Sequence, residues 1–324
     1  MASSGMRFDM RRAPFSPLSE ADMHREVLSM AAWADEHDFA HIVVSEHHGV
    51  DFTSAPLTMA AVILGRARHL NVSINAVLLP LHDPVRVAEE IATIDLMSGG
   101  RLSVVVGLGY RYDEFTMAGV DRTKRGAIFE DHVRTMLQAW TGEPFTWHGR
   151  TVTVWPKPTT PALRMLIVGG SVPVSADRAA RLRLGFCTMS TDPALGERYR
   201  AACVAEDFDQ GFFLYPTGPS FVHVAEDPER AWAELAPYAL YDATSYSTWQ
   251  TGDHDNAVDM AGRSTVEELR ASGMWQVLTP DECLALVERT GSAALHPLMG
   301  GIPPELGWSS LELYNRAVQP RIKG

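Results

Sequence analysis

The stretch LNVSINAVLLPLHDPVRVAEEIATIDLMSGGRLSVVVGLG, residues 70–109, predicts a strand, a helix and a second strand. Residues 70–80 form an apolar run, which is typical of a buried strand. The helix begins after Asp83, which serves as an N-cap, has Pro84 at its first position and ends before two glycines. Residues 101–109 form another apolar run. Strands joined by a crossover helix are parallel, so this unit indicates a parallel sheet buried on both faces.

The same alternation continues along the chain and predicts the fold class. With about eight such units, we expect an α/β fold, a single (β/α)8 TIM barrel forming one domain over residues 1–324. A doubly wound sheet is the alternative. Residues 143–161 predict a β-hairpin excursion after the fourth unit, turning at Gly149, and residues 246–265 predict an irregular surface loop. The further predicted strands are 39–46, 165–170, 185–190, 220–225 and 293–301, and the further helices are 24–38, 55–69, 125–142, 173–183, 194–208, 227–244, 279–291 and 303–320.

Composition narrows the class of protein. The 324 residues are 46% hydrophobic, enough for a full core, and the formal net charge is −12. An acidic surface argues against nucleic acid or an anionic membrane as the main partner. The three cysteines are far apart in the sequence, which favours a reducing compartment without a disulfide framework. We find neither a signal-peptide pattern nor an apolar run of about 20 residues, so we expect a cytoplasmic enzyme or binding domain.

Polar residues and glycines gather where the predicted strands end. In a (β/α)8 barrel, ligands bind at the carboxyl ends of the strands, so these residues predict a concave site at one mouth. Each residue also has an ordinary structural explanation, such as a hydrogen-bonded core histidine, a satisfied buried amide or a tight turn before a helix. The residues concerned are Glu46, His47 and His48, Asn75, Gly107–Tyr112 and Gly169–Ser171.

The sequence argues against three other kinds of site: a metal site, a dinucleotide-binding motif and a nucleophile elbow. His47 and His48 are adjacent, so in an extended chain they point to opposite sides and make poor joint ligands; we expect no metal. The run GLGYRY has Tyr112 where a dinucleotide-binding motif needs its third glycine. The run GGSVP has Pro173 where a nucleophile elbow needs a glycine. Cys187 is expected to be a small buried hydrophobe.

The combination of motifs resembles the bacterial luciferase-like family of flavin-dependent monooxygenases and oxidoreductases. The resemblance extends from about Arg7 to Pro320, and its most specific part is residues 75–102. The motifs that carry it are SEHHG, NAVLLPLHDPVRVAEEIATIDLMSGGRL, GLGYRYDEFTMAGVD, RGAIFEDHV, IVGGSVPVSADRAARL and HPLMGGIPPELGWSSLELY.

The resemblance implies a TIM barrel that binds flavin at the carboxyl-terminal mouth. It implies a cis peptide bond between Asn75 and Ala76 beneath the isoalloxazine, and it selects His47 as the catalytic histidine with Glu46 orienting its neighbours. The family's reactive cysteine falls on Gly107 and its phosphate-binding arginine on Leu108, which argues against light emission. The cofactor-binding residues that we expect are Asn75, Ala76, Gly107, Tyr112, Gly169, Gly170 and Ser171. The apolar lining that we expect is Val77, Leu79, Phe115, Met189 and Met299.

The resemblance also implies a chemistry. Reduced FMN, delivered by a separate flavin reductase, reacts with O2, and the resulting C4a-(hydro)peroxyflavin oxygenates a small organic substrate. One alternative is an oxidoreductase of the same fold that transfers hydride with 8-hydroxy-5-deazaflavin. A branch with that coenzyme often has an Asp-His pair where this chain has Glu46-His47-His48, which favours FMN. Another alternative is a flavin-binding protein without catalysis. The family commonly forms dimers, so we expect a homodimer.

Overall fold

A computed structural model of the chain describes residues 3–249 and 265–322. One mostly parallel sheet runs through it, with its strands hydrogen-bonded in the order β11-β10-β12-β1-β2-β3-β4-β7-β8-β9. A separate two-stranded sheet contains β5 and β6. The strands are β1 (Ser3–Phe8), β2 (His41–Val44), β3 (Asn71–Leu78), β4 (Leu102–Gly107), β5 (Phe145–Trp147), β6 (Arg150–Val152), β7 (Leu166–Gly169), β8 (Gly185–Cys187), β9 (Phe213–Leu214), β10 (Phe221–Val224), β11 (Trp275–Leu278) and β12 (Ser292–Leu295).

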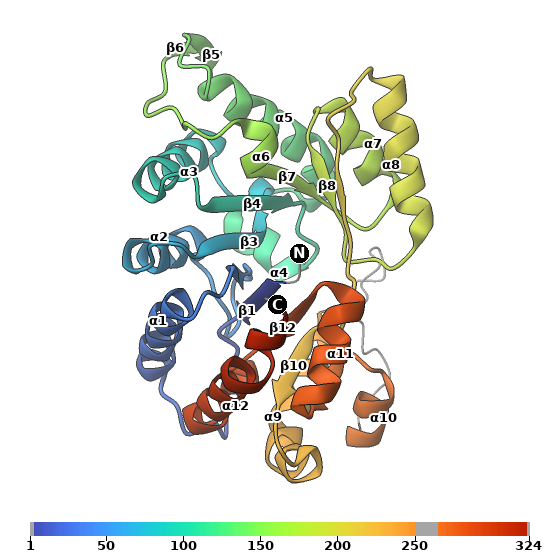
Figure 1. Cartoon of the computed structure of the whole chain (residues 1–324). Coiled ribbons are helices and arrows are strands. Elements are labelled where there is room, and N and C mark those ends of the chain that lie inside the picture. Colours follow the sequence, from blue (N-terminus) through green and yellow to red (C-terminus); the bar gives the residue numbers. More distant parts are fainter. Residues whose placement is uncertain (1–2, 250–264, 323–324) are drawn as a thin grey trace.

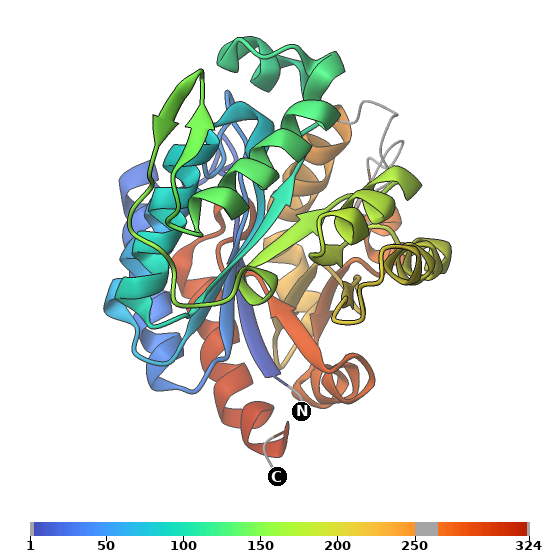
Figure 2. The ribbon, with the colours of Figure 1, turned by 90° about the horizontal axis from the view of Figure 1, so that it is seen from above.

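Helices surround the sheet on its outer side (Figure 1). Seen from above, the strands run from the end that holds both chain termini towards the end that holds α4 and α5 (Figure 2). The helices are α1 (Glu20–Glu36), α2 (Pro56–Arg66), α3 (Pro84–Ser98), α4 (Tyr112–Ala118), α5 (Arg125–Ala139), α6 (Ala162–Met165), α7 (Pro173–Arg181), α8 (Pro193–Ala205), α9 (Pro228–Thr248), α10 (Val266–Ala271), α11 (Pro280–Thr290), α12 (Pro304–Ala317) and α13 (Gln319–Ile322), with 3-10 turns η1 (Leu79–Leu81), η2 (Arg122–Lys124) and η3 (Met299–Gly301). None of the described helices is long and apolar enough to cross a membrane.

The sheet departs from the closed eight-stranded barrel that the sequence predicts. Its hydrogen-bonded order ends at β11 on one side and β9 on the other, so the ring is open there. The sequence does not predict the strand Trp275–Leu278. Its four residues alternate in burial, but a run of this length is too short to show the two-residue hydrophobic period of a strand. What remains is an α/β fold with a parallel sheet, in which the carboxyl ends of neighbouring strands meet on one side.

The strand–helix–strand unit at residues 70–109 folds as its sequence pattern indicates. Asp83 accepts hydrogen bonds from the backbone N–H groups of Val85 and Arg86, and α3 ends at Gly99, which has a left-handed backbone. Strands β3 and β4 pair in parallel, with an irregular register between Asn75 and Val77. This irregularity lies at the carboxyl end of β3, where the site is expected.

The excursion after β4 and α5 forms an antiparallel pair. Phe145 faces Val152 across the two strands. Gly149 in the turn has a φ of +71°, a backbone conformation that residues with a side chain rarely adopt. Residues 246–265 depart from the predicted loop at both ends: α9 continues to Thr248, and Thr265 caps α10. Residues 250–264 lie outside the described residues.

A buried carboxylate joins α3 to the chain that returns from the hairpin. Asp95 Oδ2 accepts hydrogen bonds from Thr159 N at 2.7 Å, Thr159 Oγ1 at 3.0 Å and Thr160 N at 3.1 Å. Burial by itself raises the pKa of Asp95, but the hydrogen bonds from Thr160 and Thr159 outweigh it and the pKa is lowered.

Replacing Asp95 by alanine is expected to lower the free energy of unfolding by about 1–3 kcal/mol, because two partly buried backbone N–H groups, those of Thr159 and Thr160, lose their acceptor. The folded-state pKa lies below that of the unfolded chain, so the carboxylate stabilises the fold above a pH of about 4 and this contribution falls as the pH drops further. Urea unfolding at pH 7 and pH 3 measures both effects. Glu90→Ala on the exposed face of α3 is the matched control, and an equal loss in both variants would contradict the prediction.

Candidate functional site

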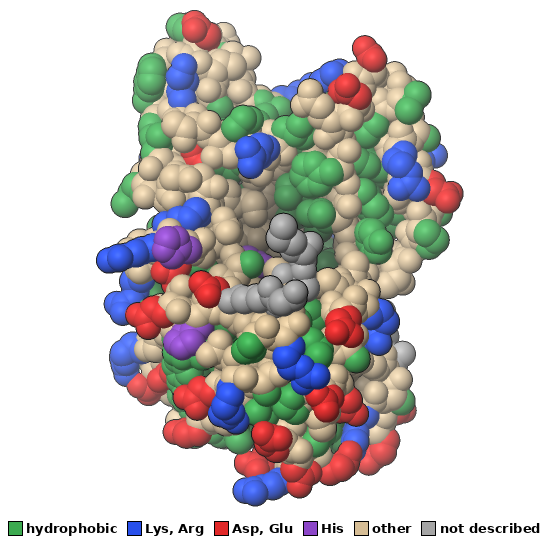
Figure 3. Space-filling model, viewed as in Figure 1, with side chains coloured by type: hydrophobic (Ala, Val, Ile, Leu, Met, Phe, Trp, Pro, Cys, Tyr) green, Lys and Arg blue, Asp and Glu red, His purple; other side chains and the backbone are tan. Residues whose placement is uncertain are grey.

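A cavity of about 580 Å³ lies on the inner side of the curved sheet, and most of the predicted site residues line it. It extends past the strand ends to Gly5 and His41, near the starts of β1 and β2. The surface is hollowed on the side of the molecule that faces the reader, with hydrophobic side chains along the α7–α8 edge (Figure 3). The predicted residues that line the cavity are Glu46, His47, Asn75, Ala76, Gly107, Gly169, Gly170 and Ser171.

Tyr112, which the sequence predicts as a cofactor-binding residue, is not among the residues that line this cavity. It is the first residue of α4, its ring is 62% exposed, and the Arg122 guanidinium lies 4.1 Å from the ring centroid. The chain turns between the end of β4 and α4, so Tyr110, two residues earlier, lines the cavity in its place. Of the predicted apolar lining only Met189 borders the cavity. The other four side chains are buried elsewhere: Val77, Leu79, Phe115 and Met299.

The wall formed by β3 and β4 is made of small residues. The peptide bond between Asn75 and Ala76 is cis, as the resemblance implied. A Cβ atom added to Gly107 would lie 3.2 Å from the Cβ of Ala76, closer than most real contacts. Asn75 Nδ2 lies 3.9 Å from Cys187 Sγ on β8. Burial raises the pKa of the Cys187 thiol to about 11, so this sulfur is not an activated nucleophile.

His47 turns into the cavity and is held by a carboxylate that the sequence did not reveal. Its Nδ1 lies 2.8 Å from Glu114 Oε1 on α4. The same oxygen accepts the His48 backbone N–H at 3.0 Å, and Arg111 Nη1 lies 3.3 Å from it. Because an ionised carboxylate only accepts hydrogen bonds, it favours the tautomer with hydrogen on Nδ1, which places the lone pair of His47 on Nε2.

Aromatic rings enclose the His47 imidazole. The ring centroids of Phe52, Trp249 and Tyr110 lie 4.8, 5.0 and 5.6 Å from its own. Tyr110 Oη is 3.5 Å from His47 Nε2. Burial lowers the pKa of His47, and the hydrogen bond with Glu114 offsets this only in part. The imidazole is therefore mainly neutral near pH 7 and able to accept a proton.

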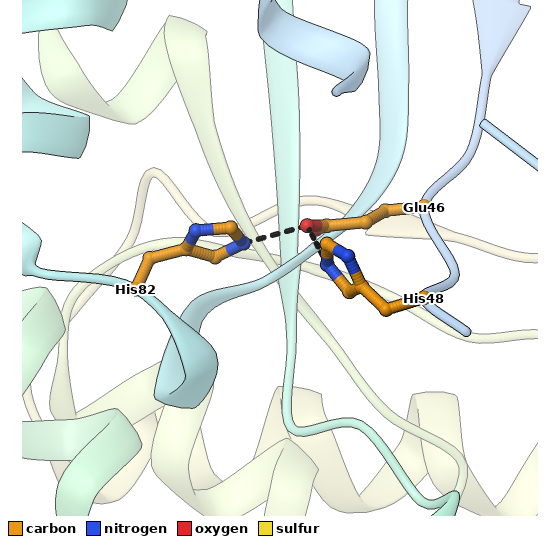
Figure 4. A group of neighbouring side chains, drawn as sticks. All are labelled: Glu46, His48 and His82. Atoms are coloured by element: carbon orange, nitrogen blue, oxygen red, sulfur yellow. Dashed lines mark hydrogen bonds and ion pairs between the residues drawn. The ribbon is translucent and has the colours of Figure 1, made fainter. Parts of the chain in front are cut away.

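Glu46 turns away from His47, to the other side of the chain. Its Oε1 lies 2.7 Å from His48 Nε2 and 2.6 Å from His82 Nε2, and its Oε2 accepts the Leu78 backbone N–H at 2.6 Å (Figure 4). Burial raises the pKa of Glu46, but the hydrogen bonds from His48 and His82 outweigh this and lower it to about 2. The carboxylate is thus ionised at neutral pH and ties β2 to the end of β3.

The turn after β7 and the following helix bring Gly170 and a buried cation, Arg178, to the same cavity. The Gly170 N–H donates to Cys187 O at 3.0 Å, so this N–H is occupied within the fold. Gly170 instead leaves room: a Cβ there would lie 2.3 Å from Ser175 Oγ. Arg178, one helical turn after Ser175 on α7, lines the cavity and is only 7% exposed. Its Nε and Nη1 have no hydrogen-bond partner among the described residues.

A buried guanidinium with two nitrogen atoms that make no hydrogen bond to the described residues indicates an anion site. Burial lowers the pKa of Arg178, and the nearest carboxylate oxygen, Oε2 of Glu130, lies 3.8 Å from its Nε. A buried charge without a hydrogen-bonded partner is costly, so a site of this kind favours an anionic ligand. The chemistry of this corner of the cavity, with Ser171, Ser175 and Arg178, fits a phosphate group.

The sequence analysis missed Glu114 and Arg178, and it included Arg111 only as part of the run Gly107–Tyr112 without assigning it a role. Glu114 lies 67 residues from His47, on the helix after β4. Nothing in the helical pattern distinguishes an inward carboxylate or guanidinium from a solvated one. The one available signal was position, because all three lie within about ten residues of the carboxyl end of a strand, where a barrel places its ligand contacts.

A larger cavity of about 730 Å³ lies elsewhere, lined by residues of α1, α2 and the chain between β2 and α2. It contains none of the predicted site residues. Volume alone therefore does not select the site; convergence of polar groups at the strand ends does.

Comparison with known proteins identifies the family. The chain is 28% identical over 179 residues to an F420-dependent glucose-6-phosphate dehydrogenase from Nakamurella multipartita, covering 51% of this chain and 52% of that one. It is 27% identical over 172 residues to an FMNH(2)-dependent dimethylsulfone monooxygenase from Pseudomonas putida, covering 50% and 47%. The chain spans about half the length of the curated relatives that it matches.

Structural comparison agrees at the level of the fold. The monooxygenase RslO1 from Streptomyces bottropensis has a TM-score of 0.78, with 24% identity and 99% of each chain covered. The family model described as luciferase-like monooxygenase matches residues 7–292. Relatives in this family include both flavin-dependent monooxygenases and F420-dependent oxidoreductases. The chain belongs to the luciferase-like monooxygenase family.

Proposed function

We propose that this protein is a flavin-dependent monooxygenase that uses reduced FMN and O2 to oxygenate a small organic substrate. The observation that carries the proposal is one cavity bordered by two groups: the His47–Glu114 pair and the buried guanidinium of Arg178, whose Nε and Nη1 make no hydrogen bond to the described residues. The first is suited to moving a proton and the second to holding a phosphate. Family membership supports an enzyme of the oxidoreductase class.

The phosphate end of FMN is assigned to the start of α7. Arg178 offers Nε and Nη1 to the phosphate oxygens, and Ser171 and Ser175 offer hydroxyl groups from the same side of the cavity. Arginine suits this task because its planar fork matches two phosphate oxygens at once. Arg125, at the first position of α5, also lines the cavity and adds positive charge.

The ring of the flavin is assigned to the wall of small residues. Ala76 and Gly107 lie against each other without bulky side chains, which suits a flat aromatic system. Asn75 borders the same part of the cavity and offers an amide, and Gly169 on β7 continues the wall. Bound reduced FMN would supply the electrons that activate O2.

His47 is assigned the proton transfers. Glu114 holds hydrogen on Nδ1, so Nε2 can accept a proton from a reacting group in the cavity and return it later. Phe52, Trp249 and Tyr110 surround the imidazole and restrict the approach of water to it. Glu46 orients the backbone on either side of His47, through its hydrogen bonds with His48 and Leu78.

A flavin reductase that supplies reduced FMN, a homodimer and a cytoplasmic location complete the proposal. They follow from the family resemblance and from the acidic, cysteine-poor sequence. Sedimentation velocity at micromolar concentration tests the dimer, which a monomer would contradict.

A titration with three cofactors tests the function. We expect the protein to bind FMN and reduced FMN, and to form oxygenated products from a panel of small organic substrates when reduced FMN and air are supplied. Mass spectrometry after incubation under ¹⁸O2 identifies the incorporated oxygen atom. Binding of 8-hydroxy-5-deazaflavin with hydride transfer that is independent of O2 would assign the chain to the other branch found among its relatives. Tight binding of oxidised FMN without any product would indicate a non-catalytic flavoprotein.

A further inference from the structure

Two histidines and a glutamate converge beside the cavity, from two separate segments. Glu46 and His48 follow β2, and His82 lies 36 residues after Glu46, next to the residue that caps α3. One ligand atom from each lies within 4.8 Å of the others. Both imidazoles present Nε2 to the same carboxylate oxygen (Figure 4). We propose that Glu46, His48 and His82 form a binding site for a divalent transition metal ion of the zinc type.

The donor set matches this class of ion. Two imidazoles and one carboxylate, with water completing the coordination, occur at zinc sites and at non-haem iron sites. Imidazole nitrogen favours zinc and its neighbours over Mg²⁺ and Ca²⁺, which prefer oxygen ligands. The sequence alone argued against a metal because His47 and His48 are adjacent and diverge; the partner of His48 is His82, which only the fold brings near.

Glu46 is held as a ligating carboxylate would be. Its side chain is fully buried, and Oε2 is fixed by the Leu78 backbone N–H at 2.6 Å, leaving Oε1 directed at the imidazoles. Carboxylates that bind metals are commonly oriented by such a second hydrogen bond. The two imidazoles are more open, with side chains 22% and 32% exposed, so an ion and its water ligands can reach the cluster from solvent.

The separations from Glu46 Oε1 require only a small adjustment, and the two imidazole nitrogens lie within 4.8 Å of each other. Ligand atoms bonded to one zinc ion at about 2.1 Å lie about 3.0–3.4 Å apart. The present separations from Glu46 Oε1 are 2.7 Å to His48 Nε2 and 2.6 Å to His82 Nε2, so each imidazole moves outward by about half an ångström. Each neutral ring then carries its hydrogen on Nδ1, and the Nε2 lone pair faces the ion.

The local charge also favours a cation. Arg111 lies nearby and donates to His48 O at 2.7 Å, but it is balanced by Glu114, 3.3 Å away. With both imidazoles neutral, Glu46 is the remaining negative charge of the cluster. An ion bound there would fix the chain that carries His47 through its neighbours Glu46 and His48, which goes beyond the proposed oxygenation chemistry.

Metal binding to the full-length, chelator-treated protein tests the site. Equilibrium dialysis with Zn²⁺, followed by metal analysis, is expected to give one ion per chain, with Mg²⁺ not competing. His48→Ala and His82→Ala are each expected to weaken Zn²⁺ binding at least 10-fold, whereas His69→Ala, an exposed histidine outside the cluster, is expected to bind like the parent protein. Zn²⁺ should raise the melting temperature of the parent and of His69→Ala, but not of His82→Ala.

A second variant separates loss of a ligand from loss of folding. His82→Gln keeps an N–H donor for Glu46 but removes the imidazole lone pair, so it should fold normally and still bind Zn²⁺ at least 10-fold more weakly. Unchanged affinity in folded His82→Gln, or the absence of stoichiometric Zn²⁺ in the parent protein, would overturn the proposal and leave the cluster a hydrogen-bonded brace. FMN titrations on the same samples report on the flavin site independently.

Discussion

Replacing His47 by alanine is expected to lower the rate of product formation about 100- to 10,000-fold, the usual contribution of a positioned acid–base group. FMN affinity should stay within a few-fold of the parent value, because the imidazole lies apart from the assigned phosphate corner. Product formation with saturating reduced FMN under air gives the rate, and fluorescence titration with FMN gives the affinity. The split between rate and affinity distinguishes a proton-transfer role from a role in holding the cofactor.

The neighbours of His47 sharpen this test. Glu114→Gln keeps the size of the side chain but no longer fixes the Nδ1–H tautomer as an ionised carboxylate does, so an intermediate loss of rate is expected. His48→Ala should lose less activity than His47→Ala, because its ring turns to Glu46 and away from the cavity. A larger loss for His48→Ala with the fold intact would reverse the assignment of the pair. Full activity in both histidine variants would make the cluster purely structural.

Arg178→Ala is expected to weaken FMN binding about 10- to 150-fold, the equivalent of one or two charge-assisted hydrogen bonds worth about 1.5–3 kcal/mol. Riboflavin, which lacks the phosphate, should bind the parent protein worse than FMN does and should lose little further affinity in the variant. Titration of both ligands into both proteins isolates the phosphate contribution as a double-mutant cycle does.

The matched control for Arg178 is Arg198→Ala. Arg198 is an exposed arginine on α8 that forms a surface ion pair with Asp177 of α7, so its removal preserves the buried corner. FMN affinity is expected to be unchanged in that variant. An equal loss of FMN and riboflavin affinity in Arg178→Ala would mean that the guanidinium supports the cavity wall and does not hold phosphate.

The sequence by itself determined the parts of this protein that depend on local pattern. The strand–helix–strand unit at residues 70–109 carries its own cap at Asp83 and its own stop at Gly99, and it folds accordingly. The alternation of Glu46, His47 and His48 follows from the two-residue period of an extended chain, which directs His47 to Glu114 and pairs Glu46 with His48. Because parallel strands end on one side of a sheet, the strand-end residues were also expected to converge.

Only the tertiary structure decided which side chains complete these clusters. Glu114 lies on α4, Arg178 lies on α7, and His82 follows the 3-10 turn η1. Each of them is far along the chain from the other residues of its cluster. Their direction depends on how each element packs against the sheet, and one sequence carries no record of that packing. The open edge between β9 and β11 has the same origin: two- and four-residue strands acquire their pairing from neighbours, and their own pattern is too short to specify it.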